Sequence, residues 1–320
     1  MQLFGGLLPL TGKGGGTVVR KLLCVVLFLA LCSSAFAGGS GVYPNGAEGF
    51  WMGAVPPPGT YYVNYDLFYS SHKFMNNHGK ETRTGPLAPF TIDVFANVSR
   101  LLYVSEAKFF GGNWGAQIFV PFQDVNFKSA INSHTSGLGD IIVDPFILAW
   151  HWPTLHIVSG LDIYVPTGDY EPGRLSNLSA NAFVYEPVLA FTYMTPLKGL
   201  TTSAKFMYDI PEANKDFTHP FLPVSGELKY GQEFHFDYSV DYMINSEWKA
   251  GLGGYYYTQI TNDKLNGVTI ENNRGQVFAI GPGVEFSRGR FIVSLRTQFE
   301  MFAKNKAEGI ANWLRVVYVF

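Results

Sequence analysis

The stretch Glu233–Ile244, "EFHFDYSVDYMI", decides how this chain folds. Aromatic and aliphatic side chains occupy every second position from Phe234 onward, and the alternate positions from Glu233 to Asp241 are polar. Successive side chains of a β-strand point to opposite faces of a sheet, so this alternation predicts a strand with one apolar and one polar face. No helical period competes with it.

The same alternation recurs along the chain and predicts about twelve strands. Most of these segments exceed the about 5 or 6 residues of strands in soluble sheets, and they suffice for the about 9 to 11 residues that cross a bilayer. They lie near residues 59–70, 90–105, 107–122, 137–150, 154–166, 182–194, 199–209, 231–244, 247–260, 275–287, 290–302 and 308–320.

The predicted connections alternate between long and short. The long ones are residues 71–89, 123–136, 167–181, 210–230 and 261–274, and the short ones centre on Glu106, Trp152-Pro153, Pro196 to Lys198, Asn245-Ser246 and Arg288-Gly289. Barrels of the bacterial outer membrane have short periplasmic turns, long outer loops and an even number of strands. The fold class predicted for residues 59–320 is therefore all-β: a transmembrane antiparallel β-barrel of about twelve strands, located in the outer membrane.

The chain ends in "LRVVYVF", Leu314–Phe320, which also alternates. A terminal strand stays ordered only when something holds it, and pairing with the first strand would close the barrel and leave no unpaired edge in lipid. A terminal phenylalanine with an aromatic residue two positions earlier resembles the signature that the barrel-assembly machinery reads. The predicted partners are this machinery, through the Phe320 strand, and outer-membrane lipids.

Residues 1–37 have the pattern of an export signal. Arg20 and Lys21 precede an apolar run over residues 22–31, and Ala35-Phe36-Ala37 forms a small-residue cleavage site. Cleavage would remove both cysteines, Cys24 and Cys32, and with them any disulfide. It would also lower the formal net charge from −2 to −5, because three basic residues and no acid are lost. This balance gives no basis for nucleic-acid binding.

The polar faces of the predicted strands would line the lumen, where charges need water or each other. The candidate lumen residues are Asp162, Lys205, Asp237, Asp241, Tyr255, Tyr257, Arg296, Glu300 and Arg315. Aromatic residues near strand ends would form the belts at the two membrane surfaces. The candidates for these belts are Tyr65, Tyr69, Trp114, Trp150, Trp248 and Tyr256.

Residues 38–58, "GGSGVYPNGAEGFWMGAVPPP", fit no strand. They form either a periplasmic tail, as their Gly and Pro content favours, or a segment tucked into the barrel that gates it from the periplasmic side. Glu48 is the segment's only charge, and its candidate partners are Lys205, Arg296 and Arg315. The candidate gate residues are Glu48, Phe50, Trp51 and Met52.

Four stretches resemble the bacterial outer-membrane family of the meta-pathway of phenol degradation. They are Val42–Tyr69 ("VYPNGAEGFWMGAVPPPGTYYVNYDLFY"), Gly137–Phe146 ("GLGDIIVDPF"), Val165–Tyr170 ("VPTGDY") and Gly231–Asp263 ("GQEFHFDYSVDYMINSEWKAGLGGYYYTQITND"). The resemblance implies a β-barrel that passes hydrophobic or aromatic compounds across the outer membrane.

The predicted function is diffusion of a small hydrophobic solute through the lumen of a monomeric barrel. Two alternatives stay open: a lipid-modifying enzyme of the outer membrane that uses His134 and Ser136, and a structural or surface-interaction barrel. The sequence has no G-x-S-x-G, H-E-x-x-H, phosphate-binding loop or Cys/His metal spacing. Accordingly, no enzymatic activity, catalytic residue, cofactor or metal is predicted.

Overall fold

The structure is a computed structural model that describes residues 39–320. The predicted export signal over residues 1–37 lies outside the described residues, and so does Gly38. Within residues 39–320, no helix is long and apolar enough to cross a membrane.

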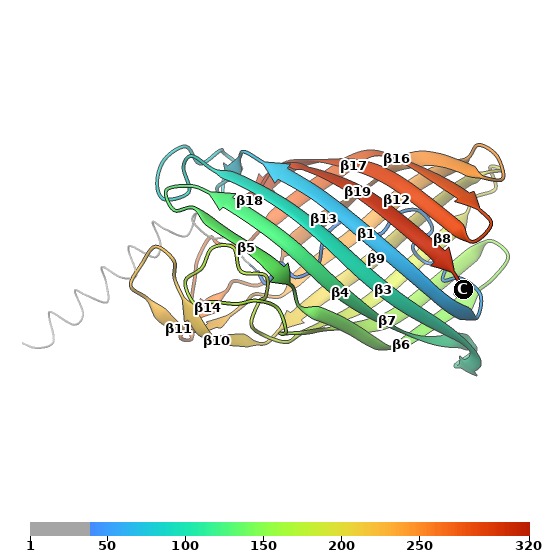
Figure 1. The fold of residues 1–320 in the computed structure, drawn as a ribbon, viewed down its shortest axis with the longest axis horizontal. Coiled ribbons are helices and arrows are strands. Elements are labelled where there is room, and N and C mark those ends of the chain that lie inside the picture. The colour runs from blue at the N-terminus through green and yellow to red at the C-terminus, as the bar shows by residue number, and fades with distance from the viewer. Residues whose placement is uncertain (1–38) are drawn as a thin grey trace, which may run out of the picture.

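Twelve long antiparallel strands form one closed sheet, which confirms the predicted barrel (Figure 1). The register from Tyr61–Val319 to Ser70–Ile310 joins the first strand to the last and so holds the end of the chain. Each strand pairs with the next in this order: β1 (Gly59–Ser71), β3 (Thr91–Phe109), β4 (Gly112–Lys128), β6 (Ile141–His151), β7 (Leu155–Val165), β8 (Val184–Met194), β9 (Leu200–Pro211), β12 (Glu233–Met243), β13 (Trp248–Gln259), β16 (Gln276–Arg288), β17 (Phe291–Lys304) and β19 (Ile310–Val319).

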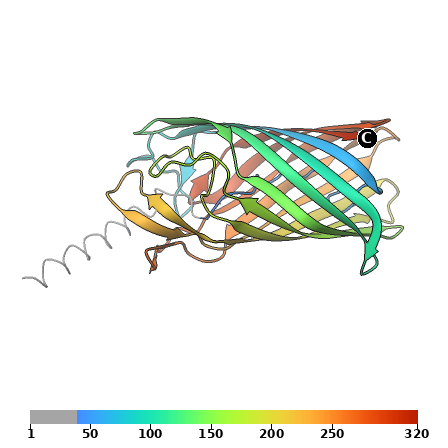
Figure 2. The ribbon, with the colours of Figure 1, turned by 60° about the horizontal axis from the view of Figure 1, so that its bottom comes forward.

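The two ends of the barrel differ, as the spacing of the connections predicted. Tight turns gather at the end that holds the C-terminus, and long loops gather at the other end (Figures 1 and 2). The loop end is the outer one by the rule for outer-membrane barrels. Short strands stiffen its loops: β2 (Phe74–Met75), β5 (Ser133–Leu138), β10 (Ala213–Thr218), β11 (Ser225–Lys229), β14 (Lys264–Leu265), β15 (Val268–Thr269) and β18 (Lys306–Ala307).

The outside of the wall is largely apolar, whereas the inside is polar along β12 and β17 and mostly apolar along β1 and β3. On β17, for example, Leu295 is 56% exposed while the neighbouring Ser294 is buried. The outside also holds a small polar cluster on β1 and β3, where the Asn97 amide donates to Asp66 (2.7 Å) and Asn64 (3.1 Å). These mutual bonds lower the cost of polar groups on a surface that faces lipid.

Two details of the sequence prediction are wrong. The turn expected at Glu106 lies at Phe110-Gly111, because an irregularity in the β3–β4 register between Val104 and Lys108 lengthens the hairpin. Both turn residues have positive φ, 50° and 80°, as the tightest hairpin turns require. Tyr65 and Tyr69 are not belt residues, since their side chains point into the lumen and bond there to Arg100 and Glu300.

Candidate functional site

The N-terminal segment, residues 39–58, lies inside the barrel along its length. At the outer end the Gly39 N–H donates to Asp263 (3.3 Å), which follows β13. Further in, the Gly53 N–H donates to Thr192 on β8 (2.9 Å). At the periplasmic end Tyr61 donates to the Pro57 carbonyl (2.6 Å). The segment therefore passes from the outer mouth to the periplasmic rim, further than a plug confined to the periplasmic opening.

Two buried acids hold the outer end of the segment. Glu233, at the start of β12, accepts bonds from the Ser40 N–H, the Ser40 hydroxyl (2.8 Å) and the Gly41 N–H (3.3 Å). Asp263 accepts from Gly39 and from the N–H of Gly231 (2.6 Å), which precedes β12. Burial raises the pKa of Asp263 to about 6, while the hydrogen bond from Gly231 acts in the opposite direction. At the outer end, backbone N–H groups of the segment therefore donate hydrogen bonds to the carboxylates of Glu233 and Asp263.

The middle of the segment is fastened to β12 and β17. Asp237 accepts from the Gly46 N–H (2.9 Å) and the Tyr43 hydroxyl (2.9 Å). Arg296 donates to the carbonyls of Gly46 (2.7 Å), Ala47 (2.7 Å) and Glu48. A side chain at Gly46 would collide with Gln298, since an added Cβ would lie 2.2 Å from its amide oxygen. The φ of Gly46 is 82°, in the left-handed region that favours glycine whatever the space around it.

Glu48 lies at the centre of a group of cations from three strands. Its carboxylate is 3.4 Å from Arg100, 3.6 Å from Lys205 and 3.9 Å from Arg315. Two of its predicted partners, Lys205 and Arg315, thus approach it, whereas Arg296 binds backbone carbonyls instead. Arg100 was not predicted, although the alternation of β3 places it on the lumen face beside Val98 and Leu102.

The candidate gate residues after Glu48 contact the wall of the lumen on the periplasmic side of Glu48. Phe50 is 3% exposed and packs near Gly283. Trp51 donates to Asp241 (3.3 Å), and the Lys249 ammonium lies 4.2 Å from its ring centre. Met52 is half-buried in the turn that follows. The segment then continues to Val55, which packs against an apolar cluster of the wall.

The remaining predicted lumen residues also lie on the inner face. Tyr255 and Tyr69 both donate to Glu300, on β17 (2.7 Å for Tyr69). Arg315 donates to Glu285 (2.9 Å), which Lys249 also approaches. Asp162 accepts from Gln117 (3.2 Å), and Tyr257 is buried near Gly39.

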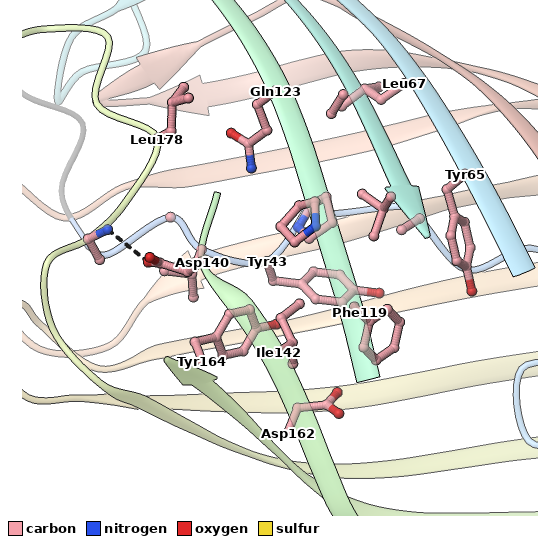
Figure 3. A pocket seen from close by; sticks show the side chains of 18 of the residues that line it. Tyr43, Tyr65, Leu67, Phe119, Gln123, Asp140, Ile142, Asp162, Tyr164 and Leu178 are labelled. Carbon is pink, nitrogen blue, oxygen red and sulfur yellow. Dashed lines mark hydrogen bonds between the residues drawn. The ribbon is translucent and has the colours of Figure 1, made fainter. Parts of the chain in front are cut away.

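Because the segment is fastened to β12 and β17, a cavity of about 260 Å³ remains between it and the opposite wall (Figure 3). Most of its lining is apolar: Val42, Tyr43, Leu67, Ala96, Val98, Phe119, Ile142 and Tyr164. Polar groups lie at its two ends. Asp140, which accepts from the Ala180 N–H (3.1 Å), stands at the outer end, and Asp162, Lys205 and Glu48 stand at mid-lumen.

A second cavity of about 210 Å³ lies at the outer mouth, between the segment and the loops. Tyr170, Arg174, Phe217 and Tyr230 are among the residues that line it. The two cavities share four lining residues: Ser40, Asn177, Ser179 and Ala180. A short partition therefore separates the outer cavity from the inner one.

Solved structures of low sequence identity share this fold. An outer membrane channel from Pseudomonas putida F1 aligns with a TM-score of 0.75 at 16% identity, covering 85% of this chain and 99% of that one. The β domain of the Bordetella autotransporter BrkA aligns with a TM-score of 0.50 at 9% identity, covering 82% of this chain and 100% of that one. No curated protein matches the chain.

A family model described as "Putative MetA-pathway of phenol degradation" matches residues 71–316, which include all twelve barrel strands in whole or in part. Its match spans most of the chain and reaches from the end of β1 into β19. The chain belongs to this family of outer-membrane β-barrels.

Proposed function

We propose that the protein is an outer-membrane channel through which small apolar or aromatic molecules diffuse along the inner cavity. The apolar cavity between the N-terminal segment and the wall carries this proposal. Specific small-molecule sites are mostly apolar, with few and well-placed polar groups. A cavity of about 150 Å³ suffices for benzene. The inner cavity, about 260 Å³, therefore has room for a substituted single ring.

The arrangement of the cavities suggests the route. A solute would enter the outer cavity, pass the partition at Ser40 and Ala180, and reach the apolar lining around Ala96 and Phe119. Further passage is opposed at mid-lumen by Glu48 and its cations, and below them by Val55 in its apolar cluster. Passage to the periplasm then requires the N-terminal segment to shift.

Narrowing the inner cavity should slow the solute. Ala96 is 6% exposed and lines the cavity, so Ala96→Phe places a ring in the path. Leu101, on the same strand, is 47% exposed on the outer face, so Leu101→Phe is the matched control. We expect Ala96→Phe to reduce uptake of labelled phenol or toluene severalfold in Gram-negative cells that depend on this barrel, and Leu101→Phe to leave uptake unchanged. Equal uptake by both variants would contradict the proposed route.

We propose two contacts for the outside of the barrel. Its apolar surface, with Leu295 and Phe299 both exposed, fits the lipid of the outer membrane. Phe320 follows the last residue of β19, and its ring packs edge-on against Tyr318 at 5.1 Å. The Phe320 side chain is 65% exposed, which fits recognition of this aromatic pair by the barrel-assembly machinery.

One observation favours an enzyme as the second candidate. His134 contacts Asp124 (3.0 Å), and Ser136 lies directly opposite Asp124 in the β4–β5 register. A nucleophile, a base and an orienting acid are needed together. His134 and Ser136 are exposed and Asp124 is half-buried, yet no hydrogen bond joins His134 to Ser136 among the described residues. We therefore propose that the barrel is not a hydrolase.

This assignment predicts the behaviour of Ser136→Ala. Purified barrel should release no fatty acid from phospholipid or from a nitrophenyl ester above the rate of a detergent blank, and Ser136→Ala should behave as the wild type does. Hydrolysis by the wild type that disappears in both Ser136→Ala and His134→Ala would establish the enzyme instead.

A further inference from the structure

Three side chains from adjacent strands converge beneath the N-terminal segment. Glu186 on β8, Asp209 on β9 and His235 on β12 each offer a ligand atom, and these atoms lie within 4.8 Å of one another. The His235 Nε2 atom is 3.4 Å from Glu186 Oε2 and 3.2 Å from Asp209 Oδ2. A tetrahedral zinc ion with bonds of about 2.0–2.1 Å holds its ligand atoms about 3.3–3.4 Å apart. The spacing therefore fits three corners of such a site.

The three side chains are fully buried and have bonding capacity left over. Glu186 Oε1, Asp209 Oδ1 and His235 Nδ1 have no hydrogen-bond partner within residues 39–320. Buried polar atoms without a partner are rare and costly. A carboxylate can bind a metal through either oxygen or both. A cation between Glu186 and Asp209 would therefore give their unpartnered oxygens a ligand role.

The charges of this part of the lumen also leave room for a cation. Four buried carboxylates face it from four neighbouring strands: Asp162, Glu186, Asp209 and Glu233. The side-chain cations that face them among the described residues are Lys205, His235, Lys306 and, toward Asp162, Arg100, which itself lies 3.4 Å from Glu48. Lys205 already pairs with Glu48 of the segment, so the carboxylates outnumber the remaining cations. Adjacent carboxylates cannot all stay ionised without a neighbouring positive charge.

We propose that Glu186, Asp209 and His235 bind a divalent transition-metal ion of the Zn²⁺ kind. Imidazole nitrogen and carboxylate oxygen are both ligands of zinc, and a site with three protein ligands leaves the fourth position open. Tyr164 donates to Glu186 Oε2 (3.2 Å) and would orient that ligand. The Tyr43 ring lies 4.9 Å from the His235 ring and covers the site from the lumen. The ion would therefore link three wall strands directly beneath the N-terminal segment.

The alternative occupant of this cluster is a proton on His235, which would make the imidazolium a shared donor to both acids. Only the metal ion would give stoichiometric metal binding, so measuring bound metal distinguishes it from the proton. Tag-free, folded barrel in detergent is dialysed against a chelator, then against micromolar Zn²⁺, then against metal-free buffer. We expect the wild type to retain one zinc per chain by elemental analysis, and to give the intense visible absorption of tetrahedral Co²⁺ when cobalt replaces zinc.

His235→Ala should reduce the retained zinc to background. The matched control is His134→Ala, which removes an exposed histidine that also contacts an acid. Folding is checked for each variant by its heat-modifiable gel migration, and Glu186→Gln replaces His235→Ala if that variant does not fold. Wild type that retains no zinc, or zinc that survives both His235→Ala and Glu186→Gln, overturns the proposal. Zinc that His134→Ala removes equally well also overturns it.

Discussion

Deleting residues 38–55, with the export signal kept, is expected to raise the conductance of the barrel severalfold. The deletion removes Glu48, Phe50 and Trp51 from the lumen, together with Val55, which packs in the periplasmic half. No strand is lost, because β1 begins at Gly59 and closes on β19 by itself. Single-channel recording in planar bilayers measures the effect directly. Uptake of the aromatic probe should rise in parallel.

A shorter deletion separates the parts of the segment. Removing residues 38–42 takes away the contacts with Glu233 and Asp263 but leaves Tyr43, Glu48 and the Arg296 bonds in place. Its conductance should stay much closer to the wild-type value. A barrel whose conductance is the same with and without residues 38–55 would show that the segment does not limit passage.

The fold was predictable because its signal is local. In β12 the apolar and polar positions are cleanly separated, and every second residue from Glu233 to Asp241 is buried in the structure. Register between neighbouring strands follows from tight turns and from the need to keep one face apolar. Long strands with tight turns at one end therefore led from the sequence to a closed barrel.

The prediction was wrong where the local signal is ambiguous. The β1 sequence, "GTYYVNYDLFYSS", has aromatic residues on both faces, so alternation alone does not say which tyrosines face lipid. In the structure Tyr65 points into the lumen, where the Arg100 guanidinium donates a hydrogen bond to its hydroxyl (2.8 Å). With Tyr65 inside, the neighbouring Asp66 faces outward, where Asn97 compensates it.

The candidate site was predictable only in part. Alternation indicated which residues face inward, and the run Phe50 to Met52 made a docked segment one of two alternatives for residues 38–58, whose Gly and Pro content favoured a tail. Which side chains meet depends on the relative positions of strands far apart in the sequence. Arg100 meets Glu48 across 52 positions, and His235 meets Glu186 across 49, so neither pair leaves a motif in the chain. The cluster of Glu186, Asp209 and His235 was missed for this reason.

Glu48→Gln is expected to release the segment without unfolding the barrel. The carboxylate lies within 4.0 Å of Arg100, Lys205 and Arg315, so its loss leaves three cations close together without their shared anion. Removing one partner of a buried ion pair costs about 3–5 kcal/mol. Most of this cost should act on the docking of the segment, because the strands keep their ladders. Conductance should move toward that of the deletion, while heat-modifiable migration stays unchanged.

The cause of this effect can be tested by a second substitution. Lys205→Met in the Glu48→Gln background removes one of the cations left without an anion, so it should return conductance partway toward the wild type; two side chains 3.6 Å apart are expected to be coupled in this way. The matched control is Glu247→Gln, which breaks an exposed pair with Arg288 (3.7 Å) at a periplasmic turn and should change nothing. If Lys205→Met adds to the effect of Glu48→Gln, the segment is held mainly by the Arg296 and Asp237 bonds. In that case the charge of Glu48 does not control the gate.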